Sequence, residues 1–278
     1  GTKAGHAGTL DPFASGLLVV LIGRATRLMP YVVGHDKRYL VDVRFGASSD
    51  TDDREGALVV SDAPAPTRDA VAQALPALAA ATEQVPPAVS AIHIDGERAY
   101  RRVRRGETIT VPPRPVRFDA IELVDWHEPS DGEVGPRATL DVRCATGTYM
   151  RALARDLGEA VGCPAHCVEL RRLEVGEWSV DDPAAPAPDA VTFEHVRDPL
   201  ELVPDLPRLQ LDADQLADVA AGRRLPASLL PGLVGAAALL APDGTLAALA
   251  ELTSDGTLLQ PRTVLVDPVD ASVQGSPA

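Results

Sequence analysis

Two segments of the chain alternate apolar and polar residues in the way that half-buried β-strands do. In residues 38–45 the odd-numbered positions are apolar and the even-numbered ones are charged except for Leu40, and in residues 138–144 the apolar positions carry even numbers. Side chains of a strand point alternately to its two faces, so each segment has one inward side. The expected inward residues are Tyr39, Val41, Val43, Phe45, Leu140, Val142 and Cys144.

A helix is predicted over Tyr149–Ala160, with Thr148 as its N-cap and Gly162 just beyond its end. Its buried stripe would hold Tyr149, Leu153 and Leu157. Strands in residues 1–180 do not alternate regularly with helices of crossover length, and this favours an α+β fold over a doubly wound sheet.

The last hundred residues predict a second, smaller module. Residues 181–207 are rich in Pro, Asp and Ala, which is typical of a linker or an irregular surface segment. A helix is then expected over Leu209–Ala221, a hairpin turn at Asp243–Gly244 and a strand at Thr263–Val266. Residues 208–267 therefore predict a compact, mostly β module, followed by a frayed tail over 268–278.

Composition narrows the class of protein. The chain has 278 residues, of which 45% are hydrophobic, which suits one large domain plus a small one. It has neither an apolar run of about 18 residues nor a secretory start, so no membrane partner is expected. Three cysteines are too few for a disulfide framework, which favours a reducing cytoplasm. Because the first residue is Gly1, we expect the chain to be incomplete at its N-terminus.

The net charge of −14 hides an uneven distribution. Residues 1–117 carry +2, residues 118–180 carry −6 and residues 181–278 carry −10. One run in the first part concentrates positive charge, namely Arg98, Arg101, Arg102, Arg104 and Arg105. A solvated helix face remains the simpler alternative, but such faces usually intersperse acids. Contact with RNA or DNA phosphates is therefore favoured.

Residues 5–12, GHAGTLDP, combine turn formers with two ionisable side chains. Asp11 precedes a proline, which biases it away from helix and toward an extended backbone. Capping of a following helix is the simpler interpretation of this carboxylate. Neither phosphate-loop pattern of glycines is present.

Two further segments suggest metal sites and fail the test of spacing. Residues 50–56 resemble a calcium loop, but Glu55 and Ser61 stand where that loop needs Gly and Glu. A solvated turn is the simpler interpretation. Cys163 and Cys167 lack the spacing of zinc ligands, so no metal is expected. Arg151 is a cation near the start of the predicted helix, the end that favours anions, and this indicates an anionic partner elsewhere.

Five motifs, in order, resemble those of the TruB family of tRNA pseudouridine synthases. They are GHAGTLDPFASGLL (5–18), DKRYLVDVRFG (36–46) with SDTDDREG (49–56), QVPPAVSAIHIDGERAYRRVRRGE (84–107), CATGTYMRALARDLG (144–158) and AHCVELRRLEVGEW (165–178). The resemblance covers nearly the whole chain. The family also has an upstream strand that this sequence lacks.

The resemblance implies a fold and a domain order. The fold would be that of pseudouridine synthases, a mixed, largely antiparallel sheet with flanking helices and a central cleft. The catalytic domain would span 1–180, with an RNA-gripping insertion at about 84–113. A linker at 181–207 would lead to a PUA-like C-terminal domain at 208–267.

The resemblance also implies roles for individual residues. Asp11 would be the nucleophile, Arg151 would pair with it and orient it, and Tyr39 would stack on the target base. Leu170 would line the same pocket. His6 would fill the space left by the flipped uridine, and Asp53 would contact the flipped nucleotides. The arginine cluster and the small domain would hold the stem of the RNA.

The expected activity is conversion of a T-loop uridine of tRNA, position 55, to pseudouridine without a cofactor or metal. Attack of Asp11 on C1′, its addition to C6, and elimination all remain open. The partner would be the T arm of tRNA, with no obligate protein partner. A tRNA-folding chaperone without catalysis is the alternative, which retention of Asp11 and Arg151 disfavours. A guide-dependent synthase is disfavoured by the short acidic C-terminal part.

Overall fold

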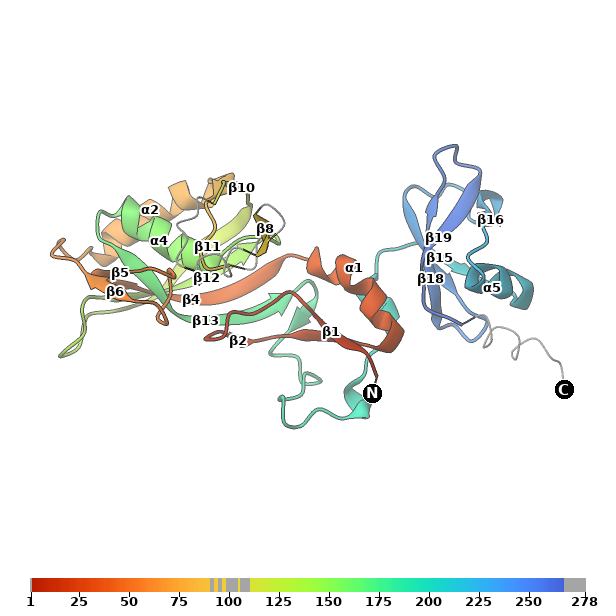
Figure 1. The fold of residues 1–278 in the computed structure, drawn as a ribbon, viewed down its shortest axis with the longest axis horizontal. Helices are drawn as coiled ribbons and strands as arrows, with labels where there is room; N and C mark the ends of the chain where they lie inside the picture. Colours follow the sequence, from red (N-terminus) through yellow and green to blue (C-terminus); the bar gives the residue numbers. More distant parts are fainter. Residues whose placement is uncertain (1, 91–92, 95–96, 99–104, 106–110, 268–278) are drawn as a thin grey trace. The chain divides into compact units, whose positions relative to one another are not determined.

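The computed structural model describes residues 2–90, 93–94, 97–98, 105 and 111–267. They form two compact units, each described here by itself (Figure 1). The sheet unit comprises Thr9–Leu18 and Gly34–Ala185. The split unit comprises the described parts of Gly1–Gly8, Val19–Val33 and Pro186–Ala278. A long central sheet organises the first unit and a shorter sheet the second.

The sheet unit is built on a six-stranded sheet in the order β11-β12-β4-β13-β14, with β2 paired to β13. All of its strand pairs are antiparallel except the pair of β2 with β13. The strands are β2 (Ser15–Gly16), β4 (Lys37–Phe45), β11 (Phe118–His127), β12 (Arg137–Cys144), β13 (Ala165–Val175) and β14 (Trp178–Ser179). This largely antiparallel sheet confirms the predicted α+β class.

Strand β4 occupies the middle of the sheet, and the face that it buries is apolar from Tyr39 to Phe45. The predicted inward residues of β4 and β12 are all buried, which confirms both alternation patterns. Helices α2 (Arg68–Ala79) and α4 (Met150–Ala160) cover the apolar face, α2 over β11 and α4 over β13 and β4 (Figure 1). This layer of helices and strands forms the main core.

Helix α4 begins one residue later than predicted and its N-terminus is capped differently. Thr148 donates its hydroxyl to the Ala145 carbonyl at 2.9 Å and does not cap the helix. The N-cap is Tyr149, whose amide donates to Oε1 of Gln84 at 2.9 Å. Leu153 and Leu157 are buried as predicted, whereas Tyr149 is half-buried. The prediction of Thr148 as a cap was wrong because its hydroxyl bonds backward to the preceding turn.

Three short strand pairs extend the sheet unit. They are β5 (Ala47–Ser49) with β6 (Leu58–Val60), β7 (Glu83–Gln84) with β10 (Arg114–Pro115), and β8 (His93–Ile94) with β9 (Glu97–Arg98). The last pair lies in the predicted RNA-gripping insertion, most of which falls outside the described residues.

Strand β2 lies so close to β13 that it requires a glycine. Gly16 has φ +101°, and a Cβ built there would stand 2.1 Å from the Arg172 carbonyl oxygen. The neighbouring Leu17 amide donates to that same oxygen at 2.8 Å. The loop that carries Asp11 is thereby fixed to the central sheet at its C-terminal end.

Gly16→Ala is expected to lower the free energy of unfolding by about 2–4 kcal/mol, because positive φ and overpacking both oppose a methyl group there. Gly132→Ala is the matched control: its φ is +84° and nothing lies within 4 Å of an added Cβ. That variant reports the cost of φ alone. Urea unfolding followed by the fluorescence of Trp126 and Trp178 measures both, and equal losses would contradict the close packing.

The split unit contains an N-terminal hairpin and a C-terminal sheet. The hairpin pairs β1 (Ala4–Ala7) with β3 (Val19–Ile22), and η1 (Gly23–Leu28) and α1 (Met29–Val33) follow it. The short 3-10 helices η2 (Phe193–His195) and η3 (Pro199–Leu202) lie in the predicted linker.

The C-terminal sheet has the order β15-β17-β18-β19-β16. Its elements are β15 (Arg208–Gln210), α5 (Ala213–Ala220), β16 (Leu225–Pro226), η4 (Ala227–Leu229), β17 (Ala236–Leu240), β18 (Leu246–Leu252) and β19 (Leu258–Val264). These elements enclose their own apolar core. The mostly β character predicted for this part is confirmed, as is the turn at Asp243–Gly244, where Gly244 has φ +86°.

Two element boundaries in this part were predicted wrongly. The first residues of the expected helix 209–221 belong to β15, because Arg208–Gln210 pairs in parallel with β17, and α5 starts only after Asp212. The side chain of Asp212 accepts from the Gln215 amide at 2.8 Å and so sets the true start. The last strand ends at Val264 rather than Val266.

Candidate active site

Asp11 lies on the loop that leads into β2, and three contacts hold this loop. The Ala14 amide donates to the Asp11 carbonyl at 2.9 Å and closes a turn. Phe13 is buried in the main core, and the Arg54 guanidinium lies 5.7 Å from the centre of its ring. Gly16 and Leu17 then join the loop to β13. The Asp11 carboxylate accepts hydrogen bonds from an arginine, so capping of a following helix does not describe it.

That arginine is Arg151, in the first turn of α4, and its side chain is only 6% exposed. Its Nε and Nη2 donate to the two carboxylate oxygens of Asp11 at 3.0 and 2.9 Å. Nη2 also donates to the Val89 carbonyl at 3.0 Å. Nη1 donates to the Thr51 carbonyl at 2.9 Å and lies 3.2 Å from Oδ2 of Asp53. A guanidinium has five N–H donors, and Arg151 makes four hydrogen bonds besides its ion pair with Asp53. The sequence indicated an anionic partner for Arg151, and the structure shows two, Asp11 and Asp53.

The turn that carries Asp53 is not the solvated turn of the simpler interpretation. Asp53 is buried, and its Oδ1 accepts from the Thr51 hydroxyl at 2.6 Å and the Glu55 amide at 2.9 Å. The Cys167 amide of β13 donates to the Asp52 carbonyl at 3.0 Å and ties the turn to the sheet. Asp52 has φ +60°, a left-handed conformation that aspartate tolerates better than most residues.

A second arginine, Arg155, follows Arg151 by one turn of α4. It contacts the same two segments as Arg151, the turn at residues 50–56 and the stretch at residues 85–89. Nη1 of Arg155 donates to Oδ2 of Asp52 at 2.8 Å, and its Nη2 donates to the Val85 carbonyl at 2.7 Å. Burial raises the pKa of Asp52, although Arg155 and Arg151 act in the opposite direction. Residues four apart share one helix face, so this spacing within α4 was a signal that sequence reasoning did not use.

Tyr39 and Leu170 lie on the apolar face of the sheet beside this network. Both are buried in the core that also holds Phe13, and Tyr39 keeps 9% exposure. Burial raises the pKa of Tyr39 to about 12, Arg172 acts to lower it, and the Asp11 carboxylate adds a smaller upward effect. Asp11 contributes in the same way to the raised pKa of the buried Cys167. The structure thus brings together Asp11, Tyr39, Asp53, Arg151 and Leu170.

The two carboxylates bound to Arg151 differ in access to solvent. The side chain of Asp11 is 31% exposed, whereas that of Asp53 is 7% exposed. One cation between two carboxylates leaves a formal charge of −1. Since Asp53 is enclosed, Asp11 is the carboxylate of this pair that can meet a ligand. Such an arrangement presents one oriented nucleophile or base beside an aromatic ring.

The other predicted residues belong to the split unit, to the insertion, or to stretches that the structure does not describe. His6 is exposed on β1 and belongs to the split unit. Arg105 is exposed, and Arg98 contributes backbone to β9. Arg101, Arg102 and Arg104 lie outside the described residues.

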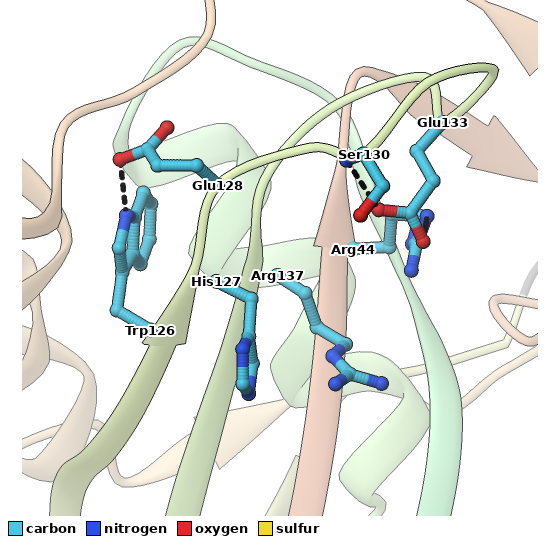
Figure 2. Close-up of a pocket in the computed structure, with 7 residues that line it drawn as sticks. All are labelled: Arg44, Trp126, His127, Glu128, Ser130, Glu133 and Arg137. Atoms are coloured by element: carbon cyan, nitrogen blue, oxygen red, sulfur yellow. Dashed lines mark hydrogen bonds and ion pairs between the residues drawn. The ribbon is translucent and has the colours of Figure 1, made fainter.

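A separate hollow of about 300 Å³ lies near the ends of β11, β12 and β4 (Figure 2). His127, Arg137 and Arg44 are cross-strand neighbours there. The Arg44 guanidinium lies 2.6 Å from the Glu133 carboxylate, and Arg137 lies 3.4 Å from that of Asp42. Acids thus neutralise the cations of this hollow, and its lining includes none of the predicted site residues.

Two absences hold for the described ranges alone. No group of three or more His, Cys, Asp or Glu side chains among these residues is arranged to hold a metal ion. Nor is any helix in this portion of the chain long and apolar enough to cross a bilayer.

Two family models match adjoining parts of the sequence. Residues 1–150 match the TruB family pseudouridylate synthase (N terminal domain), and residues 151–213 match the tRNA pseudouridylate synthase B C-terminal domain. A tRNA pseudouridine synthase B from Arthrobacter sp. (strain FB24) is 42% identical over 89% of this chain and 83% of its own length. One from Parasynechococcus marenigrum (strain WH8102) is 41% identical over 94% of this chain and 87% of its own.

Solved structures show the same fold at lower identity. A Cbf5–Nop10–Gar1 complex contains a chain that superposes with a TM-score of 0.65 at 22% identity, covering 97% of this chain and 78% of that one. An H/ACA ribonucleoprotein bound to a substrate RNA containing 2′-deoxyuridine gives a TM-score of 0.63 at 21% identity, over 96% and 77%.

Proposed function

The chain belongs to the TruB family of pseudouridylate synthases, and on that basis we propose that it converts a uridine in the T loop of tRNA, position 55, to pseudouridine. The observation that carries the proposal is the Asp11–Arg151 pair, whose aspartate is the exposed member of an otherwise buried ionic network. The same pair disfavours a chaperone without catalysis, since RNA binding alone does not need an oriented carboxylate.

The reaction is an isomerisation in which nothing is gained or lost overall. The N1–C1′ bond of uridine breaks, the uracil turns, and C5 bonds to C1′. The proton leaves C5 and N1 acquires one, so no electron carrier enters the balance. During the turn a protein group must act on the ribose or on the base. Asp11 would perform that step, and the support for this role is that Arg151 holds both of its oxygens while its side chain stays partly open.

Three other residues would complete the pocket. Tyr39, on which the charge of Asp11 acts, would stack on the uracil, and Leu170, which is buried in the same core, would contact the same base. Asp53 contributes through Arg151: its carboxylate occupies one edge of the guanidinium, so the other edge faces Asp11. The enclosure of the Asp53 carboxylate disfavours its direct contact with the flipped nucleotides.

The T loop is folded, so its uridine must leave the stack before it can reach Asp11. The exposed His6 on β1 would occupy the vacated space. Arg98, Arg101, Arg102, Arg104 and Arg105 would contact the phosphates of the stem. We place the reaction in the cytoplasm, where tRNA is processed.

The C-terminal part, which we assign as a PUA-like domain over residues 208–267, would add a weaker contact with the RNA. Arg223 and Arg224 are exposed there, and they bond Asp218 and Gln260. Exposed pairs of this kind are worth little and are easily exchanged for a phosphate. The acidic surroundings argue for shape rather than charge as the basis of that contact.

Release of tritium from T-arm RNA labelled with [5-³H]uridine tests the proposed function directly. The RNA carries label at the T-loop uridine, and a matched RNA carries cytidine at that position and label elsewhere. We expect release from the first RNA alone. Release from both would contradict the assigned position, and binding of the first RNA without release would contradict the activity.

A further inference from the structure

Strand β13 carries a buried arginine, Arg172, to which the chemistry above assigns no role. Arg172 is fully buried, with 0% exposure, and is the largest side chain enclosed to that degree among the described residues. It is the direct cross-strand partner of Tyr39 on β4, just as Leu170 is the partner of Val41. Arg172 therefore points to the apolar face of the sheet, where the candidate active site lies.

The contacts of Arg172 join two parts of that site. Its Nε donates to the Leu17 carbonyl at 2.8 Å, at the end of the loop that carries Asp11. Its backbone carbonyl accepts from the Leu17 amide at 2.8 Å, and Gly16 packs on the same peptide. The guanidinium also acts on the Tyr39 phenol, lowering its pKa through its charge and through a side-chain hydrogen bond, against the larger upward effect of burial. One side chain thus contacts both the Asp11 loop and the aromatic ring.

Burying a guanidinium lowers the stability of a protein unless its contacts compensate for the loss of hydration. Removing the charge from water costs several kcal/mol, and an apolar side chain of similar size would pack there at lower cost. Leucine at position 170 shows that this face of β13 accepts such a residue. What an arginine adds is a set of N–H donors and a positive charge next to the phenol oxygen.

We propose that Arg172 is a positioning residue for Tyr39. It donates to the phenol oxygen, which fixes the ring against the sheet and directs the O–H bond away from β13. Its Nε bond to the Leu17 carbonyl fixes the guanidinium itself, so that its other donors keep their position beside the ring. The inference rests on the proposed function, because it assigns Tyr39 to the pocket that receives the uridine.

A purely structural arginine and a positioning arginine predict different results in a double-mutant cycle. If Arg172 acts through the Tyr39 hydroxyl, its removal matters little once that hydroxyl is gone. If Arg172 only anchors the Asp11 loop, its removal costs as much in the Tyr39→Phe background as in the wild type. The cycle therefore compares Arg172→Met, Tyr39→Phe and the double variant.

The rates would be single-turnover tritium release at saturating enzyme, with RNA affinity measured in parallel. We expect Arg172→Met to slow release about 10–100-fold with the dissociation constant for RNA unchanged within about twofold. The double variant should be within about threefold of Tyr39→Phe, and Arg172→Lys should recover part of the rate. Arg171→Met is the control, because the neighbouring Arg171 is exposed and should keep the wild-type rate. The proposal would be overturned if the losses of the two single variants multiplied in the double variant, or if Arg172→Met kept full activity.

A second measurement does not depend on catalysis. Tyrosine labelled with ¹³C at the ring carbon bonded to oxygen gives one NMR signal for each of the four tyrosines, and Tyr39→Phe identifies that of Tyr39. We expect Arg172→Lys, which keeps a cation and supports folding, to shift the Tyr39 signal more than the other three. An unmoved Tyr39 signal would overturn the proposal. If the wild type released no tritium, the proposed function would fail while this signal still reported on the contact.

Discussion

Asp11→Asn is expected to leave RNA binding intact and to abolish tritium release, a loss of at least about 10⁴-fold in turnover. Asparagine has nearly the same shape, but it carries no negative charge and cannot act as a nucleophile. Its amide would also set an N–H₂ group against the Nε or Nη2 donors of Arg151, which now meet carboxylate oxygens at 3.0 and 2.9 Å. Single-turnover release and filter binding measure the two effects separately.

Asp62→Asn is the matched control for this variant, since it makes the same chemical change at an exposed position of the sheet unit. It should release tritium at the wild-type rate. Retention of more than about 1% of wild-type turnover by Asp11→Asn would remove Asp11 from the role of nucleophile. Loss of RNA binding would instead show that the change disturbs the loop.

Arg151→Met should combine loss of activity with loss of stability. The side chain of Asp53 is 7% exposed. Without the Arg151 guanidinium its carboxylate stays buried, and the described contacts give it no other cation. Breaking a buried pair in this way costs about 3–5 kcal/mol. Asp11 would lose both of its bonds from Arg151 as well, and turnover should fall at least 10²-fold, the order of magnitude expected for a misplaced catalytic group. Thermal unfolding and tritium release give the two values.

Two comparisons test whether the buried charge of Asp53 causes the loss of stability expected for Arg151→Met. Arg155→Met removes the neighbouring, 25% exposed arginine from Asp52 and should destabilise the protein less. Adding Asp53→Asn to Arg151→Met should restore part of the lost stability, because it removes the uncompensated charge. A double variant that is less stable than Arg151→Met would refute that explanation.

Local patterns predicted the parts of the fold that depend on neighbours in sequence. The alternation around Tyr39 and Leu140 correctly predicted two central strands and their buried faces. A period of two residues with one apolar side indicates a half-buried strand. The start of α4 was predicted to within one residue. Pairing between distant segments was not accessible in this way: Arg208–Gln210 continues a helical pattern, yet β17 recruits it into a sheet.

The same limit applies to the candidate site. The cation at the start of α4 indicated an unknown anion, but nothing near it in sequence identified Asp53, which is almost a hundred positions earlier. Arg172 was missed although a signal existed: Leu170 faces inward, so the residue two positions later does too. A register shift after Cys167 interrupts the alternation of β13 and weakens that signal.

The pairing of β4 also determines when the protein can complete its fold during synthesis. Tyr39 pairs with Val142 on one side and Arg172 on the other, so it is synthesised more than a hundred residues before either partner. At elongation rates of about 5–20 residues per second that delay is on the order of ten seconds. Throughout it, the apolar face of the strand has no layer to join, and Asp11 has no arginine to bind. The native cover of this strand and the Asp11–Arg151 pair therefore both form late, after β12, α4 and β13 have been synthesised.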